Sequence, residues 1–148
     1  MGQSRVGKLY DEAARYMHLY CPKQTEKICF VYFISDGSYI KIGVAENIQK
    51  RIKELQIGNP KKLFLVEYLE FNYKEQAYFA EKHLHQMFAK ERMSGEWFNV
   101  ADDYDFLMFI RLIKHNGYGE SQLDTEYGGF MKQHWTIKHE VTYSIYGR

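Results

Sequence analysis

The sequence is poor in cysteine and contains no long apolar run. Its two cysteines, Cys21 and Cys29, form no CxxC pair and no Cys/His metal spacing, which argues against a disulfide scaffold or a zinc finger. No apolar stretch approaches the roughly 18 residues that a membrane helix needs. The beginning of the chain carries charges throughout, unlike a signal peptide. We therefore expect a cytoplasmic protein with no membrane partner.

An excess of charge of one sign is also missing. The chain has 20 Lys and Arg against 19 Asp and Glu, for a net charge of +1. This balance excludes a generic polycation, so a nucleic-acid partner would have to bind a local basic patch. The length of 148 residues corresponds to one domain, and a hydrophobic content of 45% is typical of a globular protein.

The most informative stretch is residues 30–51. Two β-rich runs at 31–33 and 39–42 are separated by turn residues, a pattern typical of a hairpin. Gly43 then interrupts the strand pattern, and Asn47 can cap a following helix. The apolar positions of that helix are Ile48, Ile52 and Leu55. The stretch thus brings a tyrosine and a lysine on two strands beside a helix that carries an arginine.

Beyond this stretch the pattern predicts an α+β domain. Residues 63–71 read as a third strand, with Leu65, Leu69 and Phe71 on one face. Residues 74–89 and 102–114 have the composition and spacing of helices. We expect a small antiparallel sheet of about three strands, flanked by helices.

The domain is predicted to occupy residues 28–115, with an extension at each end. Residues 1–27 contain a helical pattern from about Lys8 to Leu19, which would cover part of the domain or form an oligomer interface. Residues 116–148 are richer in glycine, lose the helical periodicity and are compatible with a short hairpin.

Five ordered features carry a family resemblance. Phe30-Val31-Tyr32 and Lys41-Ile42-Gly43 lie on neighbouring predicted strands, and Arg51 follows in the next helix. Ala80-Glu81 with Leu84-His85 forms an AExxLH motif, and residues 95–98 read GEWF. This set resembles the GIY-YIG nuclease superfamily, and its later motifs are similar to those of the phage-type branch of that superfamily.

The resemblance implies metal-dependent hydrolysis of DNA phosphodiester bonds. Glu81 would hold Mg²⁺ (or Mn²⁺), an ion that prefers oxygen ligands. Arg51 and Lys41 would stabilise charge on the phosphate oxygens. Tyr32 would activate or orient the attacking water. His85 lies one helical turn after Glu81 and would relay a proton or bond the leaving oxygen.

Some positions depart from the superfamily pattern or have supporting roles. Lys41 stands where the superfamily has a second tyrosine, so the base is either this lysine or a tyrosine, with Tyr39 two residues earlier on the same strand face. Glu96, within the GEWF motif, would cap or brace the site. His83 points away from the Glu81 side of its helix and is expected on the surface.

Taken without the resemblance, these residues also allow purely structural roles. Glu81 at the edge of an apolar stripe could form a salt bridge with a neighbouring base such as Arg51. Tyr32 could be a core tyrosine, and Lys41 could be an exposed strand lysine. His85 could be a hydrogen-bonded histidine at the edge of the core. Glu81 and His85 alone are too few ligands to predict zinc.

The expected DNA contacts flank the predicted site. They are Lys50, Lys53, Lys61 and Lys62. Residues 28–115 contain twelve Lys and Arg and twelve Asp and Glu, so binding by the domain alone should be weak and salt-sensitive. Sequence specificity would then need the extensions or a homodimer.

Two other classes of function fit the same sequence. The replacement of the second tyrosine by Lys41 is compatible with a DNA-binding module that has the nuclease fold but no turnover. The aromatic-rich ends of the chain are compatible with a protein-interaction surface. Cleavage of DNA would indicate the nuclease, DNA binding without cleavage would indicate the binding module, and the absence of both activities would indicate the interaction protein.

Overall fold

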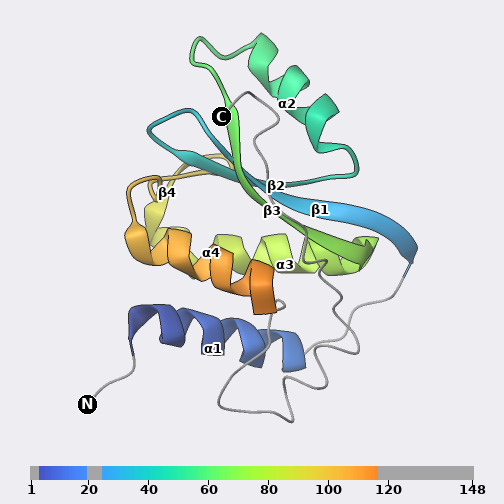
Figure 1. Ribbon diagram of the computed structural model, residues 1–148, viewed down its shortest axis with the longest axis vertical. Coiled ribbons are helices and arrows are strands. Elements are labelled where there is room, and N and C mark those ends of the chain that lie inside the picture. The colour runs from blue at the N-terminus through green and yellow to red at the C-terminus, as the bar shows by residue number, and fades with distance from the viewer. Residues whose placement is uncertain (1–3, 20–24, 117–148) are drawn as a thin grey trace.

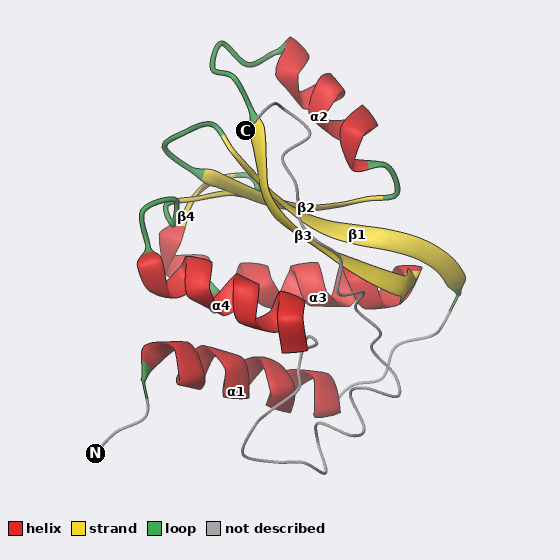
Figure 2. Cartoon of the chain, viewed as in Figure 1, coloured by secondary structure: helices red, strands yellow, loops and turns green. Residues whose placement is uncertain are grey.

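A computed structural model describes residues 4–19 and 25–116. It contains a five-stranded sheet in the order β3-β1-β2-β5-β4, in which all neighbouring strands pair antiparallel. One helix lies on one side of the sheet, and the other three lie on the opposite side in two further layers (Figures 1 and 2). The elements are α1 (Arg5–Leu19), β1 (Glu26–Ser35), β2 (Ile40–Ala45), α2 (Ile48–Ile57), β3 (Phe64–Tyr73), α3 (Lys74–Met87), a 3-10 turn (Ala89–Glu91), β4 (Arg92–Ser94), β5 (Trp97–Phe98) and α4 (Tyr104–Asn116).

The predicted α+β class with helices flanking an antiparallel sheet is confirmed, but the number of strands is wrong. The sheet has five strands and not about three, because β4 and β5 form an additional hairpin. These strands have three and two residues, too few to show an alternating pattern in the sequence. Gly95 makes their turn at a φ of +56°, a conformation that favours glycine.

The predicted central hairpin and its helix are confirmed, but the prediction that Gly43 interrupts the second strand is wrong, because β2 continues through Gly43 to Ala45 in register with β1. Asp36 organises the turn, since its Oδ1 accepts hydrogen bonds from the N–H groups of Ser38 and Tyr39, each at 2.8 Å. Asn47 caps α2 by accepting a hydrogen bond from the Lys50 N–H at 3.0 Å. Both features depend on short-range hydrogen bonds, which explains why the local sequence predicts them.

The two faces of the sheet belong to two hydrophobic clusters. Alternate residues of β1 divide between them: Phe33 packs in the larger cluster with α3 and α4, and Tyr32 packs in the smaller one with Ile52 of α2. Leu65 lies in the smaller cluster and Leu69 in the larger one, so the prediction that β3 places them on one face is wrong. A register shift opposite the Phe33–Ile34 step accounts for the change of face.

Helix α1 is part of the packed core. It begins at Arg5, three residues before the predicted start, and its Tyr10 and Ala13 are buried in the larger cluster. Arg5 also forms an ion pair with Asp103 at the start of α4, with an N–O distance of 2.9 Å. Of the two roles predicted for this helix, covering the domain is therefore the one observed. The predicted C-terminal hairpin lies outside the described residues.

Across residues 4–19 and 25–116, no helix combines the length and apolar character that crossing a membrane requires.

Candidate functional site

The candidate site lies where the outer edge of β2 is only partly covered. Strand β5 pairs with β2 at Ile40 and Lys41 and goes no further. At the next residue, the Ile42 N–H donates to the Glu96 carbonyl at 3.0 Å. The Ile42 carbonyl lies 2.8 Å from Nε2 of His85 on α3. Because a carbonyl only accepts, this contact makes Nε2 the protonated nitrogen of the neutral ring and leaves the lone pair on Nδ1.

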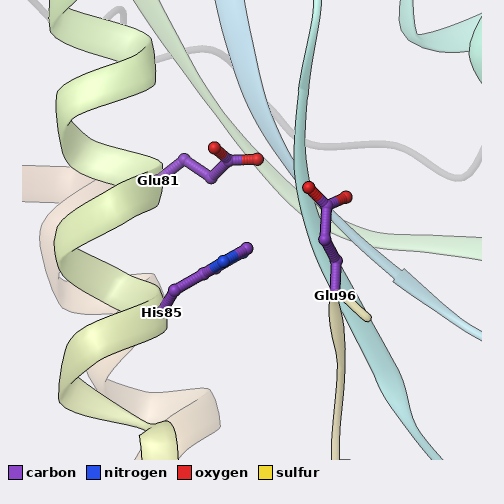
Figure 3. A group of neighbouring side chains, drawn as sticks. All are labelled: Glu81, His85 and Glu96. Carbon is purple, nitrogen blue, oxygen red and sulfur yellow. The ribbon is translucent and has the colours of Figure 1, made fainter. Parts of the chain in front are cut away.

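Three side chains that can bind metals converge at this edge. Glu81 and His85 are one helical turn apart on α3, and Glu96 comes from the turn between β4 and β5. Ligand atoms of the three residues all lie within 4.8 Å of one another. Figure 3 shows Glu81 and His85 reaching from the helix toward Glu96. We call this group the Glu81–His85–Glu96 cluster.

The cluster holds its carboxylates close together in a partly buried place. Burial, and next the charge of Glu96, raise the pKa of the Glu81 carboxyl to about 7, whereas Lys41 acts in the opposite direction. Lys41 Nζ lies 3.3 Å from a carboxylate oxygen of Glu96 and 5.6 Å from the centre of the Trp97 ring. Lys41 is only 9% exposed, so the alternative of an exposed strand lysine is wrong.

Tyr32 and Arg51 form a second pair beside this cluster. Tyr32 is 1% exposed, and its hydroxyl lies close enough to the Arg51 side chain for each group to shift the pKa of the other. Burial raises the pKa of the Tyr32 phenol, Arg51 opposes that shift, and the charges of Glu96 and Glu81 add to it. The phenol therefore lies within electrostatic range of both carboxylates of the cluster.

The carboxylate partner of Arg51 is Glu54, at 3.4 Å on the same helix. Glu81 and Arg51 both lie in the described part of the chain, and no ion pair joins them. The alternative of a salt bridge between these two residues is therefore wrong.

The family model of the T5orf172 domain matches residues 28–113, which include both strands of the central hairpin and the whole Glu81–His85–Glu96 cluster. The chain belongs to the T5orf172 domain family. This is a phage-associated domain related to nuclease-like folds. The match is to this domain and not to the GIY-YIG superfamily itself. No curated protein and no solved structure matched the chain significantly.

The T5orf172 domain brings most of the predicted site residues to one edge of its sheet. The five predicted catalytic residues (Tyr32, Lys41, Arg51, Glu81 and His85) lie in or beside the cluster. Glu96, predicted only to support the site, contributes a ligand atom. Tyr39 lies at the hairpin turn and is not one of the cluster residues.

The four predicted DNA-binding lysines are exposed and lie outside the cluster. Lys50 and Lys53 are on α2, whereas Lys61 and Lys62 are in the loop before β3. Lys61 Nζ donates to the Ser38 hydroxyl at 3.3 Å, which ties this loop to the hairpin turn.

One histidine of α3 is buried where the sequence predicted exposure. His83 was expected on the surface, but its side chain is buried between α3 and α1, with Nε2 3.9 Å from a Glu12 oxygen. It does point away from the cluster, as predicted; the error arose because α1 covers that side of α3. Burial lowers the pKa of His83 to about 4.

Four residues beside the cluster were not predicted. They are Tyr78, Lys82, Gln86 and Arg92, which line an open cavity of about 570 Å³. The same cavity is also lined by Glu81, His85, Ala89 and Glu96. The signal that would have found three of them is helical spacing. Tyr78, Lys82 and Gln86 recur every four residues and therefore lie along one face of the helix that carries Glu81.

Proposed function

We propose that this T5orf172 domain is a metal-dependent endonuclease that hydrolyses phosphodiester bonds in DNA, with a site of the GIY-YIG type. The observation that carries the proposal is the Glu81–His85–Glu96 cluster, whose ligand atoms lie within 4.8 Å of one another beside Lys41. Two acids, an imidazole and a lysine, with a tyrosine–arginine pair next to them, supply the groups that phosphodiester hydrolysis needs.

The donor set of the cluster fits a divalent cation. Glu81 and Glu96 supply the oxygen ligands that Mg²⁺ prefers, and the Nδ1 lone pair of His85 suits Mn²⁺ in addition. A cation also accounts for two carboxyl groups that lie close together in a partly buried place. When bound, the ion would neutralise charge on the phosphate oxygens.

The remaining residues would hold the phosphate and the water. Arg51, whose planar fork can bind two phosphate oxygens, and Lys41 stabilise the charge that develops during hydrolysis. The pKa of the Tyr32 phenol is raised, so Tyr32 stays protonated and orients the water by hydrogen bonding rather than taking its proton. The Nδ1 atom of His85 would accept a proton when the ion is held by the two carboxylates alone, as with Mg²⁺, and not when Nδ1 is itself a ligand.

DNA would lie across the α2 side of the sheet. Arg51, Lys50 and Lys53 are on α2, and the loop carrying Lys61 and Lys62 follows this helix. The four exposed lysines contact the phosphate backbone and carry no sequence information. Binding is expected to weaken as salt concentration rises.

A plasmid-nicking assay with Mg²⁺ or Mn²⁺ tests the proposal. The assay compares the wild-type chain with Glu81→Gln and Arg51→Gln, and each variant is checked for folding by circular dichroism. Glu46→Gln is the matched control, because Glu46 is an exposed carboxylate paired with Lys27 and lies outside the cluster. We expect nicking by the wild type and the control, no nicking by the two site variants, and no nicking by any protein in EDTA.

Other outcomes would contradict this assignment in different ways. Equal nicking by all four proteins would mean that another site or a contaminant is responsible. Full activity in EDTA would exclude the metal. No nicking by any protein, with DNA binding retained in a gel shift, would favour a binding module without turnover. Loss of both activities in a folded chain would favour a protein-interaction role.

A further inference from the structure

The cavity beside the cluster extends the site along α3. Its helical wall is formed by Tyr78, Glu81, Lys82, His85 and Gln86, which recur at the spacing of one helix face. Arg92 of β4 and Glu96 line it on the other side. We call it the α3 groove. Its volume of about 570 Å³ falls within the range of roughly 300–1,000 Å³ that is typical of small-ligand sites.

Tyr78 gives this groove an exposed aromatic surface. Its side chain is 50% exposed and belongs to neither hydrophobic cluster, so Tyr78 contributes little to the core. It lies one turn before Glu81, and the charge of that residue is among the causes that raise the pKa of the Tyr78 phenol. An exposed aromatic ring therefore lies at the margin of the cluster, where it lines the groove.

Two cations line the groove with Tyr78. Lys82 is exposed and follows Tyr78 by one helical turn. Arg92 is exposed, its guanidinium lies 5.9 Å from the centre of the Phe98 ring, and its Nε–H donates to the Gly95 carbonyl. This bond uses one of the five N–H donors of the guanidinium. The groove thus combines a stacking surface, anchored cationic groups and the carboxylates of the cluster.

We propose that the α3 groove binds an unpaired nucleotide next to the phosphate that is cleaved. The base stacks on Tyr78, and Arg92 and Lys82 contact the adjoining phosphate. A base in a duplex has both faces covered by its neighbours, so only an unstacked base can offer a face to the tyrosine. The substrate class is therefore DNA with single-stranded character at the cleavage point, such as a flap, a frayed end or a single strand. This inference rests on the proposed nuclease function for the cleavage step but not for the binding step.

Binding can be measured without cleavage. The probe is a fluorescein-labelled single strand of about twelve thymidines, within the range of site sizes known for single-strand binders, and the comparison is the same strand annealed to its complement. Fluorescence anisotropy of the full chain is recorded in EDTA and again in Ca²⁺. The variants are Tyr78→Ala and Tyr78→Phe. Tyr104→Ala is the matched control, since Tyr104 is an exposed tyrosine on α4 that does not line the groove.

Loss of stacking predicts a selective defect. Tyr78→Ala should weaken single-strand binding between about fivefold and a hundredfold, and duplex binding much less. Tyr78→Phe, which keeps the ring, and Tyr104→Ala should bind like the wild type. Arg92→Gln should weaken single-strand binding and reduce its salt dependence by about one released counterion. Because Tyr78 and Arg92 are exposed, the variants are expected to fold, and circular dichroism checks this.

Each contrary result is decisive for one of the two proposals. Wild-type binding by Tyr78→Ala, equal affinity for single strand and duplex, or no binding of the single strand by any protein would overturn the α3 groove as a nucleotide site. If any of these results is found and nicking still depends on Glu81, the nuclease proposal stands and only the nucleotide site is removed. Tyr78-dependent binding, with cleavage of neither the plasmid nor a single strand in Mg²⁺ or Mn²⁺, would retain the groove and remove the nuclease.

Discussion

The hydroxyl of Tyr32 lies directly against the backbone of Gly43, its partner across the β1–β2 pair. A Cβ atom at Gly43 would stand 2.3 Å from the Tyr32 hydroxyl oxygen and 2.5 Å from the ring carbon that carries it. No real Cβ makes such contacts, so this glycine is what lets the phenol pass over β2 and reach Arg51. The Phe30-Val31-Tyr32 and Lys41-Ile42-Gly43 tripeptides are thus tied by direct contact between Tyr32 and Gly43.

Gly43→Ala should therefore destabilise the fold. Tyr32 is fully buried and has no room to move aside, so we expect a loss of about 1–3 kcal/mol in the free energy of unfolding, measured by urea denaturation. Gly58→Ala is the control, because Gly58 has a negative φ and open space around its Cβ position. A Tyr32→Phe background should restore part of the loss. Equal unfolding midpoints for the two alanine variants would contradict this contact.

Lys41→Met should abolish nicking while leaving the fold in place. The substitution keeps an apolar stem against Trp97 but removes the ammonium that pairs with Glu96 at 3.3 Å. If Lys41 stabilises phosphate charge, we expect a fall of about a hundredfold or more in the nicking rate. Lys27→Met is the matched control: it breaks a strand lysine's ion pair with Glu46 at the surface and should change neither activity nor stability by much. Nicking at the wild-type rate by Lys41→Met would remove this lysine from the mechanism.

Lys114→Met should be far more damaging to stability than a surface lysine substitution. Lys114 Nζ is buried, donates to the Tyr68 carbonyl at 2.8 Å and lies 3.7 Å from a Glu67 oxygen. Removing one partner of a buried charge pair costs about 3 kcal/mol or more, which urea denaturation would detect. Lys62→Met serves as the exposed control. Adding Glu67→Gln to Lys114→Met should recover part of the lost stability. A loss below about 1 kcal/mol in the free energy of unfolding for Lys114→Met alone would show that the Lys114–Glu67 pair is unimportant.

His83 should make the protein less stable as the pH falls from 6.5 toward 4. Its pKa is about 4 in the folded chain and 6.5 in its ordinary state, so between these values the unfolded chain binds a proton that the folded chain does not. The stabilisation is complete above pH 6.5 and lost on acidification, by about 3–3.5 kcal/mol in total at roughly 1.4 kcal/mol per pKa unit. Glu12 is the carboxylate that faces His83 and would partly compensate a charged ring.

Urea unfolding at about pH 7.5 and about pH 5 tests this dependence. The raised pKa of Glu81 acts in the opposite sense, since its stabilising proton is lost as the pH rises, so the effect must be read from the difference between variants. His83→Asn should remove most of the acid-side loss that the wild type shows. His115→Asn, at an exposed position of α4, should retain it. Identical pH profiles for wild type and His83→Asn would refute the assignment.

The parts of the fold predicted most accurately depend on short-range interactions. Asp36 and Asn47 satisfy backbone N–H groups within three residues of themselves, so the hairpin turn and the start of α2 could be read from the local sequence. The pairing of Glu81 with His85 likewise follows from helix geometry alone. Such features need no knowledge of what packs against them.

Long-range packing decided what the local pattern could not. Whether His83 faces solvent depends on α1, which lies about seventy residues earlier in the chain and covers that side of α3. The β4–β5 hairpin is too short to have a sequence period, and its pairing with β2 is what carries Glu96 to Glu81. Long-range packing also decided between the two roles open for Lys41, because Trp97 and Glu96 cover this lysine and exclude the exposed alternative.

The sequence by itself thus determined the hairpin, the capped helix and the spacing of the acid and the imidazole on α3, because hydrogen bonds and side-chain directions within a few residues fix them. Only the tertiary structure decided that Glu96 joins Glu81 and His85, that Tyr32 reaches Arg51 over Gly43, and that Tyr78 and Arg92 line one groove. Those arrangements depend on which strand edges pair and on which helix faces are covered, and both are set by packing across the whole chain.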